Sequence, residues 1–308
     1  MVTDLVYAGE NGRYYGYDFE DVILELINNY NTNEQGFKIV SFIANDLGIL
    51  DFATYEIYGE KAPKNVKNRF GGQKKPPKSD IHIVFKKGDE LIKKGISIKS
   101  SNGSIQVQIT NVKNFKEILI KNGIVFSSSL EVGLSKFCGF GDYKPSKLLI
   151  GDFSKLSTKE LNCLINLELN TKISEKDTES IDCINNLFNL EQGRRNRWLI
   201  NELTNDERLE IKNFFTINQK KITEIVLKEG YSEEFYFADY YLYNNNEYSN
   251  TKLVDISIQN MDKVIEKSCI KPYKETSQGS FHIGDITVQM KGSGKGEAFH
   301  GLQFNKRT

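Results

Sequence analysis

An acidic residue and a lysine lie on two neighbouring segments that alternate between apolar and other residues. Asp80 precedes the first segment, and Lys99 lies within the second, GISIKS, after a short polar turn. A two-residue turn would set Asp80 opposite Ser97 and diagonal to Lys99 in an antiparallel pair. A carboxylate with nearby oxygen ligands can hold Mg²⁺, and a lysine beside it can orient an attacking water and stabilise negative charge. These residue types predict phosphodiester hydrolysis.

A second turn, SNGS, leads into a further alternating segment, IQVQIT. A two-residue Asn-Gly hairpin there sets Lys99 opposite Gln106 and Ser97 opposite Gln108. Opposed residues share a face of a sheet, so these four side chains form one polar face beside Asp80. This register is the simplest one, and a slip by one residue would reverse the two faces. We therefore expect a three-stranded antiparallel meander.

The segments KSDIHIVF and GISIKS resemble the PD-(D/E)xK nuclease motif, most of all in its type II restriction endonuclease branch. In that motif an acid near the start of one strand is followed by acid-x-lysine on the next strand. Asp80 takes the place of the first acid and Lys99 that of the lysine. The chain departs from the motif at Ser79, where the motif has proline, and at Ser97, where it has the second acid. The resemblance covers roughly residues 18–125.

The resemblance implies a Mg²⁺ cofactor with Asp80 as its first ligand and Ser97 beside it. Gln108 and Gln106 carry side-chain oxygens that can take the role of the missing acid. Members of the family often add an acid from the helix that precedes the meander. We expect Glu25 to be this acid, at the edge of the helix's apolar face, with Glu20 as the second candidate. The alternative is an ordinary strand in which Lys99 reaches solvent.

Cations gather around this motif. Residues 61–100 hold twelve lysines and arginines against three acids, a net charge of +9. We expect the proline-containing loop to contact the DNA backbone, and a solvated lysine-rich surface is the alternative. The candidate phosphate contacts in this loop are Lys74, Lys75 and Lys78.

Two further clusters are candidates for DNA recognition. Arginine is a frequent reader of guanine in the major groove, although an arginine cluster near glutamates is also typical of an ion-paired surface. The C-terminal strand GDITVQMKGSGKG carries polar residues on one face and ends in glycines that let a backbone approach phosphates. It is also a competing Gln-x-Lys active-site candidate or a plain amphipathic edge strand. The candidate DNA contacts are Arg194, Arg195, Arg197, Gln289, Lys291 and Lys295.

The elements that position these residues indicate a mixed α/β (α+β) fold, with a restriction-endonuclease-like core in which helices flank a mixed central sheet. Residues 1–155 are expected to form the nuclease core, and residues 156–308 a helical segment with C-terminal strands that recognise DNA. Periodicity and turn residues predict helices over 18–30, 37–50, 115–123, within 158–216 and over 219–229. They predict strands over 81–85, 95–100, 105–110, 146–153 and 251–258, and within 284–296.

Composition sets the remaining limits. The 308 residues carry no net charge, and no run of about 18 apolar residues is present, so no membrane span is expected. We see no secretory signal, and four scattered cysteines with three histidines make a zinc site improbable and favour the cytoplasm.

The sequence thus predicts a Mg²⁺-dependent, sequence-specific endonuclease that acts on double-stranded DNA as a homodimer. A cognate DNA methyltransferase is implied by the resemblance alone. The alternatives are a structure-specific repair or recombination nuclease, and a nucleic-acid-binding protein made inactive by the loss of the second acid at Ser97.

Overall fold

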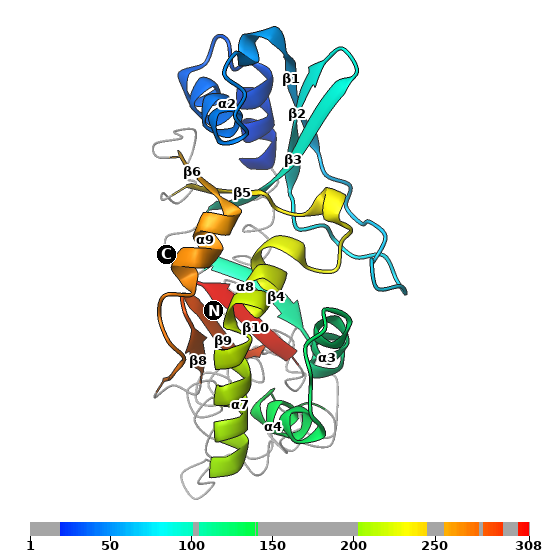
Figure 1. Ribbon diagram of the computed structural model, residues 1–308, viewed down its shortest axis with the longest axis vertical. Helices are drawn as coiled ribbons and strands as arrows, with labels where there is room; N and C mark the ends of the chain where they lie inside the picture. The colour runs from blue at the N-terminus through cyan, green and yellow to red at the C-terminus, as the bar shows by residue number, and fades with distance from the viewer. Residues whose placement is uncertain are drawn as a thin grey trace, which may run out of the picture.

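The computed structural model places two five-stranded sheets one above the other along the long axis of the molecule (Figure 1). The strand order is β1-β2-β3-β5-β6 in the first sheet and β4-β10-β9-β8-β7 in the second. The structure describes residues 19–100, 105–138, 140, 203–244, 256–276, 280–291 and 301–307. The mixture of helices and two sheets confirms the predicted α+β class.

The elements follow the chain from the first sheet to the second, then back to the first and again to the second. A helix over residues 19–28 precedes them. The strands are β1 (Glu56–Lys61), β2 (Ile81–Lys87), β3 (Glu90–Ser100), β4 (Ile105–Thr110), β5 (Tyr240–Asn244), β6 (Ile256–Asn260), β7 (Lys274–Glu275), β8 (Phe281–Ile283), β9 (Ile286–Lys291) and β10 (Gly301–Lys306). The helical segments are α2 (Glu34–Asp46), η1 (Phe52–Thr54), α3 (Val112–Lys121), α4 (Ser128–Cys138), α7 (Asn205–Ile217), α8 (Gln219–Glu224), the π-helical turn η5 (Ile225–Glu229), η6 (Glu234–Tyr236) and α9 (Met261–Ser268).

The first sheet begins with the predicted antiparallel pair of β2 and β3. Lys87 pairs with Glu90, so the turn consists of Gly88 and Asp89, and Gly88 has the positive φ of 60° that a tight turn needs. On its other edge β3 pairs with β5 in parallel, and β6 then adds antiparallel to β5. The sheet is therefore mixed, as the sequence predicts.

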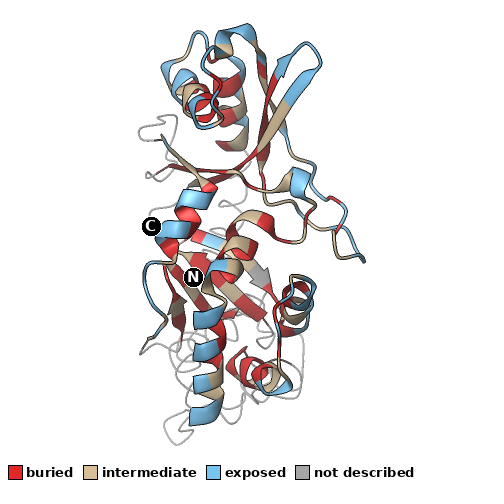
Figure 2. Cartoon of the chain, viewed as in Figure 1, coloured by how far each residue is buried: buried red, intermediate tan, exposed pale blue. Residues whose placement is uncertain are grey.

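One apolar core lies between this sheet and the N-terminal helices. It joins Phe19 and Ile23 of the first helix, residues of α2 and the alternate residues Ile96 and Ile98 of β3. Tyr240 and Leu242 of β5 belong to the same core. Figure 2 shows β5 and the adjoining part of β2 and β3 buried, whereas the far end of the β2–β3 pair is exposed. The apolar face that the sequence periodicity predicts for the first helix is therefore buried against this sheet.

A second core lies between the other sheet and the helices α3, α4 and α7. Aromatic rings dominate it: Phe115 of α3 is 5.4 Å from Phe304 of β10, and Phe215 of α7 is 4.8 Å from Phe281 of β8, between ring centroids. Each of the two cores contains residues from both halves of the sequence. The predicted division at residue 155 is therefore wrong, because each sheet takes strands from both sides of it.

The predicted hairpin of β3 and β4 is also wrong. Residues 105–110 form the expected strand, but it pairs with β10 in the second sheet, with Gln106 opposite Asn305. One edge of β3 is taken by β5, and on the other edge the backbone amide of Ile98 donates to the carboxylate of Asp80 (2.6 Å). The groups that a hairpin partner would have used are thus already bonded.

Other predictions have different outcomes. Helices predicted over 18–30, 37–50, 115–123 and 219–229 are confirmed with shifted ends, and Gly230 ends the last with a φ of 57°. The strand predicted over 146–153 lies outside the described residues. Within the described ranges, no helix has the length and apolarity to cross a lipid bilayer.

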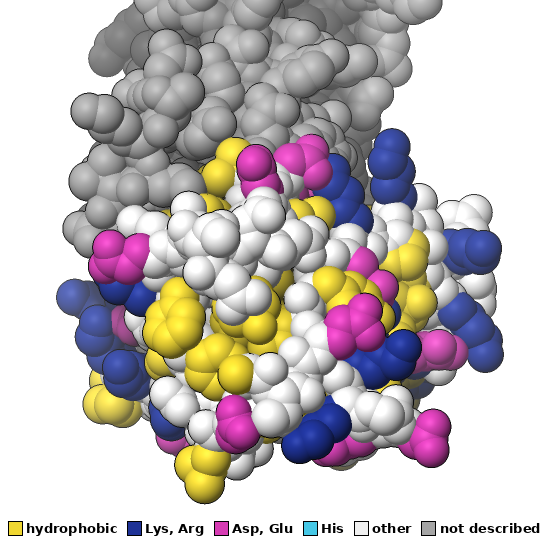
Figure 3. Space-filling view, turned by 90° about the horizontal axis from the view of Figure 1, so that it is seen from above, with side chains coloured by type: hydrophobic (Ala, Val, Ile, Leu, Met, Phe, Trp, Pro, Cys, Tyr) yellow, Lys and Arg dark blue, Asp and Glu magenta, His cyan; other side chains and the backbone are white. Residues whose placement is uncertain are grey.

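The end of the molecule formed by α2 and the β2–β3 turn presents apolar side chains to solvent. Figure 3 shows hydrophobic side chains gathered on this face with charged residues around them. Phe37 and Leu50 are exposed there, and the ring of Phe37 lies 5.8 Å from that of Phe52. The cavity described below lies at the other end of this sheet.

The interleaved fold predicts that a strand from the C-terminal half stabilises the first sheet. Leu242 is fully buried in that core, so Leu242→Ala is expected to lower the free energy of unfolding by about 2–5 kcal/mol in urea titrations. Leu209→Ala on the exposed side of α7 is the control and should change it little. Equal effects of the two variants would contradict the assignment of β5 to this core.

Candidate active site

Asp80 is bonded to three successive residues of β3. Its Oδ2 atom accepts hydrogen bonds from the Ser97 hydroxyl (3.2 Å), the Ile98 amide (2.6 Å) and the Lys99 ammonium (2.9 Å). The Asp80 amide in turn donates to the carbonyl of Ile96. The predicted register is therefore confirmed: Asp80 lies opposite Ser97 and its carboxylate reaches Lys99.

The two departures from the nuclease motif have local physical reasons. Ser97 donates to the carboxylate of Asp80 at the position where a second acid would repel it. Ser79 donates its backbone amide to the carbonyl of Tyr236, a bond that proline cannot make. Both serines are buried, so each is part of the packed structure around Asp80.

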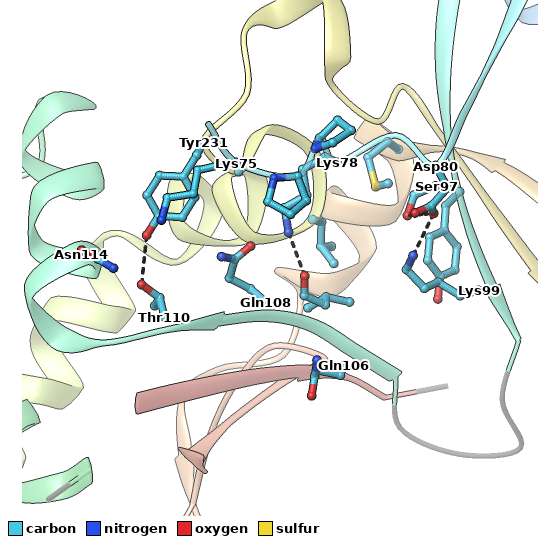
Figure 4. A pocket seen from close by; sticks show the side chains of 17 residues that line it. Lys75, Lys78, Asp80, Ser97, Lys99, Gln106, Gln108, Thr110, Asn114 and Tyr231 are labelled. Carbon is cyan, nitrogen blue, oxygen red and sulfur yellow. Dashed lines mark hydrogen bonds and ion pairs between the residues drawn. The ribbon is translucent and has the colours of Figure 1, made fainter. Parts of the chain in front are cut away.

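Asp80, Ser97 and Lys99 line a cavity of about 400 Å³ at the junction of the two sheets. Figure 4 shows Asp80, Ser97 and Lys99 at one end of it. The side chains of Asp80 and Lys99 keep 25% and 24% of their surface exposed, so the pair is accessible to a ligand. The other walls come from the 75–78 loop, β4, α3, η5, β5 and α9.

Glu20, at the start of the first helix, is the nearby second acid. Burial and the negative charge of Asp80 raise the pKa of Glu20 to about 7, while the charge of Lys99 opposes this rise. The preferred candidate, Glu25, is exposed and does not line the cavity. The helical spacing contains the signal: Glu20 lies three and seven residues before the buried Ile23 and Ile27, so it shares their side of the helix.

Lys78 does not point toward solvent as a phosphate contact would. Its ammonium donates to the carbonyls of Val107 in β4 (2.8 Å) and Val226 in η5 (2.6 Å). Burial and the neighbouring charge of Lys99 lower the pKa of Lys78 to about 7. Lys78 therefore joins the loop before Asp80 to the second sheet, and the prediction of a free cation at this position is corrected.

The glutamines approach the cavity from the second sheet and not from a hairpin with β3. Gln106 and Gln108 alternate with Val107 on β4, and both line the cavity. Gln108 is partly buried and lies between the two ends of the cavity in Figure 4, whereas Gln106 is exposed. Gln108 is thus the better placed of the two to reach a ligand beside Asp80.

Seven of the twelve lysines and arginines in residues 61–100 form salt bridges with acids in the described part of the chain, and the pair of Lys99 and Asp80 is one of them. Salt bridges join Lys61 to Asp21, Lys67 to Glu233, Arg69 to Glu229, Lys86 to Glu56, Lys93 to Glu60 and Lys94 to Asp239. Lys74 and Lys75 form no salt bridge with the described residues, although the charge of Lys75 contributes to lowering the pKa of Glu117. Lys75 lines the cavity, with its ammonium 5.6 Å from the centre of the Tyr231 ring. These two lysines remain the best candidates for a phosphate backbone.

The C-terminal candidates are only partly described. Arg194, Arg195, Arg197 and Lys295 lie outside the described residues, as does the side chain of Lys291. In β9 the apolar residues are buried and Gln289 is partly exposed, which confirms the predicted alternation of faces. The strand is not an edge strand, because it pairs with β10 on one side and β8 on the other. Gln289 does not line the cavity of Asp80.

The donor set of the site fits a Mg²⁺ ion. Three hydrogen bonds occupy Oδ2 of Asp80, and within the described residues Oδ1 accepts none. The negative charge of Asp80 already raises the pKa of Glu20, so a cation shared by the two carboxylates would relieve their repulsion. The described residues contain no cluster of three or more acidic, histidine or cysteine side chains, and Mg²⁺ commonly needs only one or two carboxylates besides water.

No protein-family model matches the sequence, and no curated protein is significantly similar to it.

The charges around Glu20 give a direct test of this geometry. Asp80→Asn should lower the pKa of Glu20 and Lys99→Met should raise it, because the first removes a like charge and the second an opposite one. Carboxyl ¹³C NMR titration of glutamate-labelled protein measures both shifts. Glu117, whose pKa is lowered by Lys121, is the internal control and should not move. Unchanged Glu20 pKa values in both variants would place the helix away from the site.

Proposed function

We propose that the protein is a Mg²⁺-dependent endonuclease that hydrolyses phosphodiester bonds of double-stranded DNA at specific sequences. The observation that carries the proposal is the ion pair of Asp80 and Lys99, 2.9 Å apart on adjacent strands and open to a cavity. An acid at the start of one strand and a lysine on the next is the arrangement that the PD-(D/E)xK resemblance implies.

Each side chain has a role in this reaction. Asp80 and Glu20 would hold Mg²⁺, which supplies a polarised phosphate oxygen and a more acidic water when it is bound. Lys99 is placed to donate to the phosphate as negative charge develops on its oxygens, and Gln108 can accept from or donate to the same group. A water oxygen bonds to phosphorus and gives up a proton while the bond from phosphorus to the leaving sugar oxygen breaks, and that oxygen takes up a proton, so the products are a phosphate monoester and a sugar hydroxyl.

The neighbouring loop would hold the DNA strand. Lys74 and Lys75 form no salt bridge among the described residues, and Lys75 faces the cavity. Phosphate contacts of this kind give affinity without sequence preference and weaken as salt is raised. Sequence preference would then come from the second sheet and from the arginine cluster at 194–197.

The proposal extends to assembly and compartment. A palindromic target implies a two-fold homodimer that cuts both strands. We expect the enzyme to act in the cytoplasm with a methyltransferase that protects the host DNA.

A structural feature also favours one alternative. Among the described residues, Asp80 is the only acidic one that lines the cavity, and Ser97 stands in the second position of the motif. A DNA-binding protein without nuclease activity would also have a single acid in this cavity. Whether Glu20 is needed for cleavage decides between an active nuclease and an inactive DNA-binding protein.

Cleavage of supercoiled plasmid in Mg²⁺ tests the proposal. The wild type should nick and linearise the plasmid, and EDTA should abolish the reaction. Asp80→Asn and Glu20→Gln should each reduce the rate at least about a hundredfold, while DNA binding in Ca²⁺ is kept. Glu25→Gln is the matched control on the exposed side of the same helix and should cut normally. A wild type that cuts no DNA would leave the binding-protein alternative, and normal cutting by Asp80→Asn would contradict the assigned site.

A further inference from the structure

The strand beside Ser97 carries a tyrosine on the same face of the sheet. In the parallel pair of β3 and β5, Tyr241 is the partner of Ser97 and Tyr243 that of Lys99. Paired residues on neighbouring strands point to the same side of a sheet, about 5 Å apart. The cores confirm the direction, because Tyr240 belongs to the core of the N-terminal helices and Tyr241 to the other one. Tyr241 accordingly lines the cavity together with Asp80, Ser97 and Lys99.

The hydroxyl of Tyr241 is buried without a partner. The residue is only 6% exposed, and its hydroxyl makes no hydrogen bond to the described residues. The ring is held in place, since it stacks on Tyr243 at 6.2 Å and an interplanar angle of 7°. A buried hydroxyl without a partner lowers stability, so we expect a partner beyond the described residues, and a ligand in the cavity can supply it.

The adjacent tyrosine on the opposite face provides the contrast. The hydroxyl of Tyr240 donates to the carboxylate of Asp46 (3.0 Å), so its hydrogen bonding is complete within the chain. Two successive phenols of one strand therefore differ: one stabilises the fold and the other faces a cavity. Burial raises the pKa of the Tyr241 phenol, so it stays protonated near neutral pH and can donate.

We propose that the Tyr241 hydroxyl is a further catalytic group that donates a hydrogen bond to a non-bridging oxygen of the phosphate at the Asp80–Lys99 pair. The inference rests on the proposed function and names the part of the substrate that this wall of the cavity recognises. The cavity favours an anion there, since the cations Lys75 and Lys99 also line it. A neutral donor at a fixed position suits a phosphate oxygen whose negative charge grows during the reaction.

Replacement by phenylalanine separates catalysis from stability. Tyr241→Phe keeps the stacked ring and removes only the hydroxyl. We expect the single-turnover cleavage rate in Mg²⁺ to fall by about a hundredfold, with DNA affinity in Ca²⁺ little changed and the melting temperature equal to or above that of the wild type. Tyr240→Phe is the matched control and should show the opposite pattern, a lower melting temperature with a normal cleavage rate.

Two outcomes would overturn the inference while the wild type cuts. A normal cleavage rate in Tyr241→Phe would mean that the hydroxyl takes no part in the reaction. A slower variant that also melts at a lower temperature would assign Tyr241 a structural role. A wild type that cuts no DNA would instead remove the proposed function on which the inference rests.

Discussion

The carboxylate of Asp80 is the constraint on which both the first sheet and the site depend. One of its oxygens accepts from the side chain of Ser97, the amide of Ile98 and the ammonium of Lys99. The bond to the Ile98 amide occupies the edge of β3 beyond its last pair with β2, while β5 occupies the other edge through Ser100. The bond to Lys99 fixes a cation next to a carboxylate at that point. One oxygen atom therefore both closes this edge of β3 and sets the polar end of the cavity.

The cavity exists because two cores meet at it. The first sheet supplies Asp80 and Lys99, whereas β4 of the second sheet supplies Gln108, which lies between the two ends of the cavity. Lys78 spans the junction by donating to a carbonyl of β4 and to one of η5. The Lys78 ammonium donates hydrogen bonds to carbonyls that lie between the two cores, and burial lowers the pKa of Lys78. A lysine two residues before the acidic residue thus holds the second sheet in place, while Lys75 remains to face a ligand.

Local features of the sequence predicted the contact between Asp80 and Lys99, whereas the pairing of strands far apart in the chain was not predicted. The two-residue turn at Gly88 fixes the register of β2 and β3, so the contact between Asp80 and Lys99 follows from neighbouring residues. The partners of β4 and β5 lie far away in the chain: Gln106 pairs with Asn305, and Ile96 with Tyr240. Alternation predicts a strand but not its partner, and a nearby Asn-Gly turn is a strong signal for a hairpin that tertiary pairing overrode. Glu20 was within reach of sequence reasoning, because its helical spacing places it with buried residues.

Mapping the cut positions on a DNA substrate of known sequence in Mg²⁺, with the wild type and with Lys99→Ala, is the most direct test of a nuclease site at the Asp80–Lys99 pair. We expect the wild type to cut at a fixed position within one short recurring sequence and Lys99→Ala to leave the DNA intact. A smear of fragments would favour a structure-specific repair nuclease over a restriction enzyme. Intact DNA with the wild type, or the same fragments with Lys99→Ala, would contradict the claim that this ion pair forms a nuclease active site.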